Sequence, residues 1–444
     1  MQSRAESAAR GIRRPRSCWL LCALLWTAAG HAHELPEAAA SQPGPTRFVT
    51  EEEAVGRLFD LLQQRLAVMP AVAAAKWQTK APIFDQPRET AVIQRAQALG
   101  ELMGLTKESV GHLFELQARL AREVQSGLHE QWSDRGFDYS GPVPGLADLR
   151  PRLDALTEGL LRALHVAAPS LRRPEWASRW RSLALGRLQG PPWTDGSRQE
   201  LLAILGGLRQ EPVSASQRVL ASGILRIGTT GDYAPFSLEK DGVLDGSDVE
   251  LAEELARDLH ARAVFVRTSW ATMLEDLQAD RFDLAMGGVS ITPARQAAAS
   301  FSESYQYGGK TILARCADAP KYPDLGAVDR PDVRVIVNPG GTNEQFIHGN
   351  VHRARIVTYP DNRGIFDELV AGHADVMITD DVEVELQTRR HAELCRSFPG
   401  TLTHADKAAL LPRDSTLVPV TNAWLHSAQA EGEPARLLNQ FLNR

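Results

Sequence analysis

The chain has 444 residues, of which 43% are hydrophobic and 23% are charged. This composition is that of a globular protein with well-filled cores, and the length is sufficient for two or three domains. The net charge of −6 at pH 7 gives no reason to expect a nucleic-acid partner.

The first 32 residues are predicted to be an export signal. An arginine-rich stretch precedes the apolar run WLLCALLWTAA at 19–29, and the small residue Ala32 follows. The run is about half the length of a membrane-spanning helix, and no later stretch approaches about 20 apolar residues. We therefore expect a periplasmic or secreted protein with no membrane segment after cleavage. Residues 33–45, rich in proline and alanine, are expected to be a disordered linker.

Residues 46–210 are predicted to form an all-helical domain. Apolar residues recur every three or four positions, and the alternation typical of strands is missing. Breaks rich in proline or glycine fall at 81–87, 139–145 and 189–196, so about six helices are expected. Thr106 is expected to begin one helix, and Asp195 or Ser197 to cap another.

Several cations of this region occupy positions that could converge. Arg65 and Lys76 are eleven residues apart on one helix, which is close to three turns, so both should point the same way even if Pro70 bends the helix. Arg88 is expected to open the next helix, and Arg150 to precede the fourth. Single arginines ordinarily lie on solvated faces, and that alternative stays open from spacing alone.

The segment RLAVMPAVAAAKWQTKAPIFDQPRE at 65–89 resembles the secreted, gamma-class, all-helical chorismate mutases, and the resemblance covers about 46–209. It implies a single-chain site that binds the dianion chorismate and rearranges it to prephenate without a covalent catalyst. Such a site must compact the substrate and stabilise charge on the ether oxygen. By the family pattern the carboxylates are held by Arg65, Arg88 and Arg150, and the ether oxygen accepts from Lys76 and Gln125.

Two positions depart from that family. Val92 stands where Glu or Gln usually meets the substrate hydroxyl, and Ala121 stands where Ser or Thr is usual. Each loses a polar contact worth about 0.5–1.5 kcal/mol, so we expect weaker binding with the reaction retained. A retired mutase kept as a scaffold is the alternative.

After a linker at 211–216, residues 217–444 show the pattern of an α/β domain. Short β-rich runs alternate with amphipathic helices, at 224–230, 263–270, 282–290, 333–338 and 375–379. The polar segments GDY, GGVSITPAR, NPGGTNE and TDDVE follow such runs directly. Ligands in such sheets bind beyond the carboxyl ends of the strands, so these segments are expected to form one site.

GTTGDYAPFS (228–237), GGVSITPARQ (287–296) and the hinge-like ILARC (312–316) resemble two-lobed periplasmic amino-acid-binding proteins. The resemblance implies one lobe at about 217–314 with 406–444, a second at about 315–405, and a ligand in the cleft between them. The site residues that it implies are Arg295 for a carboxylate, Tyr233 and Trp270 as walls, Gly288, Ser290 and Thr342 at the ligand with hydrogen bonds from the latter two, and Asp380 facing an amino group.

The stretch TDDVE at 379–383 allows two interpretations. Its spacing is that of a helix capping box, with Asp380 at the N-cap and Glu383 at the third helical position. The segments VNPGGTNE (337–344), YPDNRGIF (359–366), HAELC (391–395) and KAALLPRD (407–414) instead resemble the secreted cyclohexadienyl dehydratases. Those enzymes convert prephenate to phenylpyruvate, or arogenate to phenylalanine. In their pattern Glu383 is the proton donor, and Asn338 and Asn343 could orient the substrate.

Dehydration requires a general acid because hydroxide is a poor leaving group. Glu383 must then be protonated near neutral pH, and burial together with the like charge of Asp380 would raise its pKa. A capping role and a catalytic role can coexist. Asp380 suits the ammonium group of arogenate better than the keto group of prephenate, so the substrate preference stays open.

Two cysteines, Cys316 and Cys395, remain after the expected signal is removed. In an oxidising compartment they can pair, and the dehydratase resemblance supports this pairing. Two buried free thiols are the alternative. We recognise no cluster with metal-ligand spacing, and neither reaction is expected to need a cofactor.

The product of the first resembled enzyme is the substrate of the second. The sequence therefore predicts a bifunctional exported enzyme that binds chorismate, prephenate and arogenate. One alternative is a receptor that hands an aromatic amino acid to a membrane transporter, and another is a helical interaction module that tethers a lone dehydratase. Self-association into a homo-oligomer is compatible with the sequence.

Overall fold

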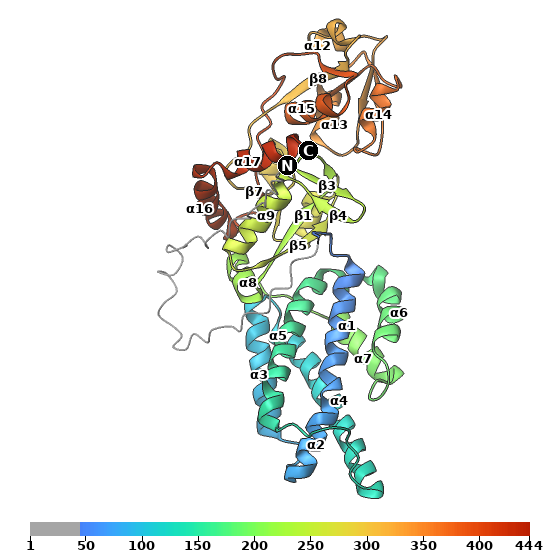
Figure 1. Cartoon of the computed structure of the whole chain (residues 1–444), viewed down its shortest axis with the longest axis vertical. Coiled ribbons are helices and arrows are strands. Elements are labelled where there is room, and N and C mark those ends of the chain that lie inside the picture. Colours follow the sequence, from blue (N-terminus) through green and yellow to red (C-terminus); the bar gives the residue numbers. More distant parts are fainter. Residues whose placement is uncertain (1–44) are drawn as a thin grey trace, which may run out of the picture.

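The computed structural model describes residues 45–444, which form a helical domain followed by two α/β lobes along one axis (Figure 1). The predicted signal at 1–32 and nearly all of the predicted linker at 33–45 lie outside the described residues. Within them, no helix has both the length and the apolarity that crossing a membrane requires. The predicted architecture, an all-helical domain before a two-lobed α/β domain, is confirmed.

The helical domain contains seven α-helices and a short 3-10 turn at Pro174–Trp176. The helices are α1 (Glu51–Ala67), α2 (Met69–Thr79), α3 (Gln86–Leu102), α4 (Lys107–Arg135), α5 (Leu146–Leu171), α6 (Ala177–Arg187) and α7 (Asp195–Gly206). The first predicted helix is two helices that meet at Val68, because the ring of Pro70 clashes with the carbonyl four residues earlier. Helices α1 and α5 and the pair α3 and α4 make the most extensive contacts around one apolar core.

Local capping explains where these helices begin. Thr106 caps α4 as predicted, since its hydroxyl accepts the N–H of Ser109 at 3.3 Å. The predicted cap of α7 is wrong: Thr194 is the N-cap, and Ser197 is the third helical residue. Arg150 also does not precede the fourth long helix but lies inside α5, which starts at Leu146 because Asp148 accepts the N–H of Gly145.

The first lobe is built on a five-stranded sheet in the order β5-β1-β6-β13-β7. Its strands are β1 (Ile224–Thr229), β5 (Arg262–Arg267), β6 (Leu284–Ala285), β7 (Ser300–Phe301) and β13 (Leu410–Leu411). A small sheet of β2 (Asp232–Tyr233), β3 (Ser237–Lys240) and β4 (Val243–Asp245) adjoins it. The helices of this lobe are α8 (Ala215–Ser222), α9 (Ser247–Asp258), α10 (Met273–Gln278), α11 (Pro293–Ala298), α16 (Leu417–Ala430) and α17 (Glu433–Leu442).

The second lobe contains a sheet in the order β10-β9-β11-β8-β12. Its strands are β8 (Lys310–Arg315), β9 (Arg334–Val337), β10 (Arg355–Thr358), β11 (Val376–Asp380) and β12 (Leu394–Arg396). Its helices are α12 (Leu325–Val328), α13 (Thr342–Asn350), α14 (Ile365–Val370) and α15 (Asp381–Arg390), with a 3-10 turn at Ala319–Lys321. Residues 312–316 are therefore not a hinge. Strand β8 hydrogen-bonds to β11 and β12, so it belongs to the second lobe and not to the first.

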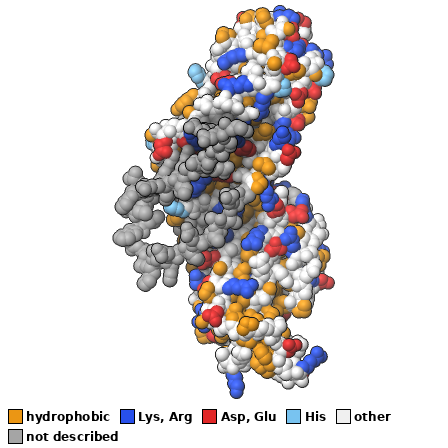
Figure 2. All heavy atoms as spheres, in the orientation of Figure 1, with side chains coloured by type: hydrophobic (Ala, Val, Ile, Leu, Met, Phe, Trp, Pro, Cys, Tyr) orange, Lys and Arg blue, Asp and Glu red, His pale blue; other side chains and the backbone are white. Residues whose placement is uncertain are grey.

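The helical domain contacts the first lobe through both of its ends. At its beginning, Phe48 forms a parallel bridge with Phe265 of β5, so residues 46–49 lie on the first lobe. At its other end the chain enters α8, which packs beside α16 and β1. On the face in Figure 2, acidic and basic side chains are interspersed, and hydrophobic ones gather at the lower end over the helical domain.

Candidate active sites

Helices α1 to α5 line an open cavity of about 190 Å³. The structure brings all seven residues predicted for the mutase site to its wall: Arg65, Lys76, Arg88, Val92, Ala121, Gln125 and Arg150. They come from five helices, so the bundle and not a single helix face makes the site.

Arg65 is the most buried cation of this cavity, with 9% of its surface exposed. Its guanidinium lies 5.5 Å from the centre of the Phe114 ring, and its Nε has no hydrogen-bond partner among the described residues. Burial lowers the pKa of Arg65 to about 10, against the opposing charge of Asp154, so it stays charged at neutral pH. A buried cation with unused donors is costly unless an anion joins it, which a ligand carboxylate would do.

Lys76 and Gln125 supply further donors in the same cavity. The ammonium group of Lys76 donates to the carbonyl of Ile83 at 2.7 Å, and burial lowers its pKa. The amide Nε2 of Gln125 donates to the carbonyl of Ala121 at 3.0 Å and lies 3.7 Å from the sulfur of Met69. Sulfur is a weak acceptor, so a ligand oxygen would readily replace it.

The sequence interpretation did not single out Glu89 and Arg122, which form an ion pair across α3 and α4 at this cavity. Arg122 also lies 5.2 Å from the centre of the Phe84 ring. Both residues directly follow a predicted site residue in the sequence, and a helix turns its neighbouring positions to different faces, so spacing gave no signal for them.

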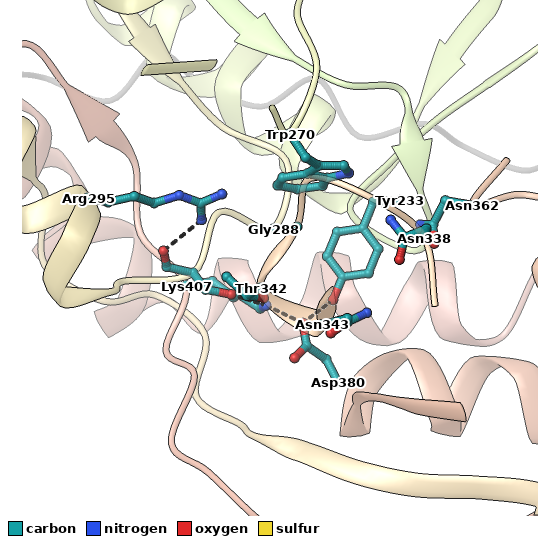
Figure 3. Close-up of a pocket in the computed structure, with 12 residues that line it drawn as sticks. Tyr233, Trp270, Gly288, Arg295, Asn338, Thr342, Asn343, Asn362, Asp380 and Lys407 are labelled. Carbon is teal, nitrogen blue, oxygen red and sulfur yellow. Dashed lines mark hydrogen bonds and ion pairs between the residues drawn. The ribbon is translucent and has the colours of Figure 1, made fainter. Parts of the chain in front are cut away.

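The second cavity lies between the lobes and is smaller, with a volume of about 30 Å³ (Figure 3). Nine residues predicted for this site line it: Tyr233, Trp270, Gly288, Ser290, Arg295, Asn338, Thr342, Asn343 and Asp380. Gly341, Asn362 and Lys407 complete the wall. Most of these residues lie at or beyond the carboxyl ends of β5, β6, β9, β10 and β11, as expected for an α/β sheet, whereas Tyr233 lies in β2 and Lys407 precedes β13.

The loop after β6 carries Gly288, whose φ of +74° favours glycine. A Cβ at this position would lie 2.5 Å from the Tyr233 ring, so only glycine lets the ring close onto the loop. The buried carboxylate of Asp248 accepts the N–H groups of Gly287 at 2.9 Å and Gly288 at 2.7 Å, which fixes the loop.

One wall of the cleft is aromatic and cationic. The rings of Tyr233 and Trp270 meet edge to face with centroids 5.7 Å apart. The guanidinium of Arg295 lies 5.9 Å from the Trp270 ring and donates to the carbonyl of Ser290 at 2.9 Å. This bond uses one end of the guanidinium, so its other donors can bind a ligand carboxylate against Trp270.

Asp380 is the centre of a buried charge cluster. Its Oδ2 accepts from the hydroxyl of Tyr233 and from Lys407 at 2.5 Å, and its Oδ1 accepts from Lys310 at 3.2 Å (Figure 3 shows Tyr233 and Lys407). Burial alone would raise the pKa of Asp380, but the two lysine charges outweigh it and hold that pKa well below its ordinary value. A ligand ammonium group, the partner expected from the sequence, would have to compete with both lysines.

Glu383 lies behind this cluster, outside the residues that line the cavity, and is 2% exposed. Its carboxyl accepts the hydroxyl of Thr379, which itself accepts from Asn343 at 2.9 Å. The capping box is not formed, because the Asp380 side chain makes no cap hydrogen bond. Burial raises the pKa of Glu383 to about 8; the charge of Asp380 adds to this effect, and the Thr379 hydroxyl opposes it. Glu383 is therefore a protonated acid at neutral pH.

Lys310 and Lys407 are functional candidates that the sequence interpretation missed. Both are buried, and Lys407 also donates to the hydroxyl of Ser290 at 2.7 Å. A lysine beside an apolar strand was the available signal, since a buried lysine needs an acidic partner.

The two lobes are held closed around the cavity. Asn362 of the second lobe donates to the carbonyl of Asp232 at 3.0 Å, and the carboxylate of Asp232 accepts from the Trp270 indole at 3.1 Å. Outside the cleft, Cys316 and Cys395 form a disulfide that joins the end of β8 to β12.

Comparisons with known proteins match the two halves of the chain to different families. The model of bacterial extracellular solute-binding proteins, family 3, matches residues 225–444, and that of chorismate mutase type II matches residues 56–126. A cyclohexadienyl dehydratase of Pseudomonas aeruginosa is 45% identical over 225 residues, which are 50% of this chain and 84% of that protein.

Two further relatives have receptor names. The histidine-binding periplasmic protein of Salmonella typhimurium is 32% identical over 164 residues, which are 36% of this chain and 61% of that protein. The crystal structure of an ancestral amino acid-binding protein, described as a precursor of cyclohexadienyl dehydratase, is 32% identical and covers 52% of this chain and 100% of its own, with a TM-score of 0.48.

Proposed function

Because the α/β half of this chain belongs to the cyclohexadienyl dehydratase family, and a chorismate mutase domain precedes it, we propose that the protein is a bifunctional enzyme. The helical cavity converts chorismate to prephenate, and the cleft converts prephenate to phenylpyruvate. The observation that carries the second step is Glu383, a buried carboxyl that stays protonated at neutral pH. Binding an amino acid does not require a proton donor, whereas dehydration does.

In the helical cavity the substrate dianion is held by Arg65, Arg88 and Arg150. Lys76 and Gln125 donate to the ether oxygen, where negative charge develops as the C–O bond breaks and the new C–C bond forms. No group of the enzyme bonds to the substrate, so the cavity acts by positioning and electrostatics. Val92 and Ala121 leave two apolar wall positions, and we expect these to weaken binding.

In the cleft Arg295 holds a carboxylate of prephenate against Trp270. Glu383 lies behind the wall of this closed cleft, so it must come to the leaving hydroxyl to give up its proton. The C–O bond then breaks, the hydroxyl leaves as water, and the ring carboxylate departs as carbon dioxide while the ring becomes aromatic. Glu383 is then an anion until it takes a proton from solvent. Lys407 and Lys310 oppose the rise in its pKa, so they stabilise that anion and ease the transfer.

The lysine pair also bears on the choice of substrate. Arogenate carries an ammonium group where prephenate carries a keto group, and Asp380 is already neutralised by Lys310 and Lys407. A further cation beside two lysines is unfavourable, whereas a keto oxygen can accept from Lys407, which lines the cleft. This favours prephenate, which is also what the helical half supplies.

Export supports the same function. The predicted signal, the disulfide and the periplasmic relative all point to a protein that works outside the cytoplasm.

The test is a one-pot reaction of the purified protein with chorismate, compared with Glu383→Gln. Glu385→Gln is the matched control, because Glu385 lies on the same helix but is exposed and paired with Arg389. We expect phenylpyruvate from the wild type and the control, and accumulated prephenate from Glu383→Gln. Persistent chorismate would contradict the mutase. Added prephenate left unchanged by the wild type would contradict the dehydratase and favour a receptor.

A further inference from the structure

We propose that the segment Thr46–Val49, which precedes the helical domain, is a positioning element of the cleft site, with Phe48 as its anchor. The kinetic part of this inference rests on the proposed dehydratase function. Nothing in the sequence pointed to it, since these residues were assigned to the helical domain. The segment lies on the first lobe and contacts the strands that lead to the cleft.

The backbone of the segment is fixed on two sides. The N–H of Val49 donates to the carbonyl of Phe265 in β5 at 2.9 Å, and the N–H of Leu244 in β4 donates to the carbonyl of Thr46 at 2.8 Å. The hydroxyl of Thr46 also donates to Glu253 of α9 at 2.5 Å. The segment thus bridges the main sheet of the first lobe and the small sheet β2–β4.

The side chain of Phe48 is built into the first lobe. It is 7% exposed and belongs to the apolar core that contains Phe265 and Leu244. The guanidinium of Arg267 lies 4.0 Å from the centre of its ring. If the segment were only laid on the surface, this ring would be exposed. Instead the Phe48 ring is part of the apolar core of the first lobe.

The ring of Phe48 also lies on Gly231. That glycine has a φ of +69°, and a Cβ on it would come within 2.8 Å of the ring. Gly231 directly precedes Asp232 and Tyr233, the two residues of β2. Phe48 therefore supports the backbone just before the residues that enter the cleft.

A second path runs through Arg267. It pairs with Glu239 of β3 at 2.6 Å and donates to the carbonyl of Thr230 at 3.4 Å. Strand β3 pairs with β2, with Tyr233 opposite Ser237. Removing the Phe48 ring loosens both supports of β2 at once.

The consequence reaches the reacting groups through Tyr233. Its hydroxyl donates to Asp380, which lies beside Glu383 and adds to the rise in the pKa of that acid. No residue of 46–49 lines the helical cavity. The loss of the Phe48 ring should therefore impair the dehydratase reaction and leave the mutase reaction unchanged. The mutase rate of the same variant then serves as the internal control.

The experiment compares Phe48→Ala, the conservative Phe48→Leu, and Phe137→Ala as a control that removes the same ring from the far end of the helical domain. For each, KM and kcat are measured with prephenate, and the mutase rate with chorismate. Hydrogen exchange is followed over 230–245 and, as a reference, over 374–380 of the second lobe.

We expect Phe48→Ala to raise KM for prephenate about tenfold, the scale of a small displacement of a binding group. Exchange over 230–245 should quicken, exchange over 374–380 and the mutase rate should not change, and Phe48→Leu should recover most of the loss. A merely structural role would lower the yield of folded protein without changing KM. Unchanged KM and unchanged exchange in folded Phe48→Ala would overturn the inference.

The two proposals fail separately. If the wild type does not convert prephenate, the dehydratase proposal falls, and the exchange over 230–245 alone decides whether Phe48 holds the small sheet. If Phe48→Ala does not fold, Phe48→Leu is compared with the wild type by the same exchange and kinetic measurements, with smaller changes expected in the same directions.

Discussion

Two acids one turn apart acquire opposite properties in the cleft. Asp380 is paired with Lys310 and Lys407 and stays ionised, whereas Glu383 meets only a hydroxyl and stays protonated. A spacing of three residues is the same for a capping box and for this pair. Both acids are buried, and what distinguishes them is the two lysine charges that the fold places beside Asp380.

The dehydratase rate should fall as the pH rises through about 8. The pKa of Glu383 is raised, so the proton that the reaction needs is present below that pH and is lost above it. A profile of kcat with prephenate against pH would show this fall as a descending limb.

Thr379→Val sharpens the pH test. The Thr379 hydroxyl lowers the pKa of Glu383, so its removal should move the limb to higher pH. Thr388→Val, on the same helix as Glu383 but bonded only to the backbone of Glu385, is the control and should leave the limb in place. A limb that moves down, or that is missing from the wild type, would argue against Glu383 as the acid.

The mutase should respond to pH only after a substitution. Gln125 donates from a neutral amide, so the wild-type rate should be nearly constant between pH 5 and 8. In Gln125→Glu the side chain can donate only when protonated, and the mutase rate should fall about tenfold or more as the pH rises over that range. Rates with chorismate at fixed ionic strength check this, and a flat profile for the variant would contradict the assignment of Gln125.

At the scale of elements, the sequence predicted those that are long and locally determined. The strands β1, β5, β9 and β11 coincide with apolar runs, and the helical breaks coincide with proline and glycine. The two-residue strands β7 and β13 were not predicted, because pairing with distant partners and not local pattern creates them. Strand β8 was mistaken for a crossing, since its run ends at Cys316 and looks like a short connector.

The same contrast divides the site residues. Those carried by a helical period or by a family motif were named from the sequence and line the two cavities, except Glu383, which lies behind the wall of the cleft. Lys310 and Lys407 were not named, because each meets Asp380 only through the fold, from 70 and 27 residues away. No local sequence pattern predicts an ion pair between residues so far apart in the chain.

The disulfide between Cys316 and Cys395 should stabilise the second lobe. It ties β8 to β12 across 79 residues, so replacing both Cys316 and Cys395 by serine should destabilise the second lobe by about 2–4 kcal/mol. Urea unfolding followed in the cleft half would measure this, while the mutase rate should be unchanged. A wild-type protein whose unfolding midpoint is indifferent to reductant would contradict it.

At the scale of the whole molecule, the two cavities are separate. Among the described residues, none lines both of them. The first lobe lies between the helical domain and the second lobe (Figure 1). We therefore expect a product that leaves the helical cavity to pass through solvent before it reaches the cleft.

Transfer through solvent predicts isotope dilution. With labelled chorismate and excess unlabelled prephenate, the label in phenylpyruvate should equal that of the free prephenate pool at each time. Glu383→Gln, which should stop at prephenate, gives the rate at which the pool gains label. Phenylpyruvate richer in label than the pool would show direct transfer and overturn this expectation.

The placement of residues 46–49 on the first lobe sets an order of events during folding. Thr46 meets Glu253 across 207 residues, and closing so long a loop costs entropy before any contact repays it. The helices between them make mostly local contacts, which form early. Once folded, they bring the two ends of the loop to one side of the molecule and shorten the search. We therefore expect the first described segment of the chain to be among the last to find its partners, after the helical domain has brought them near.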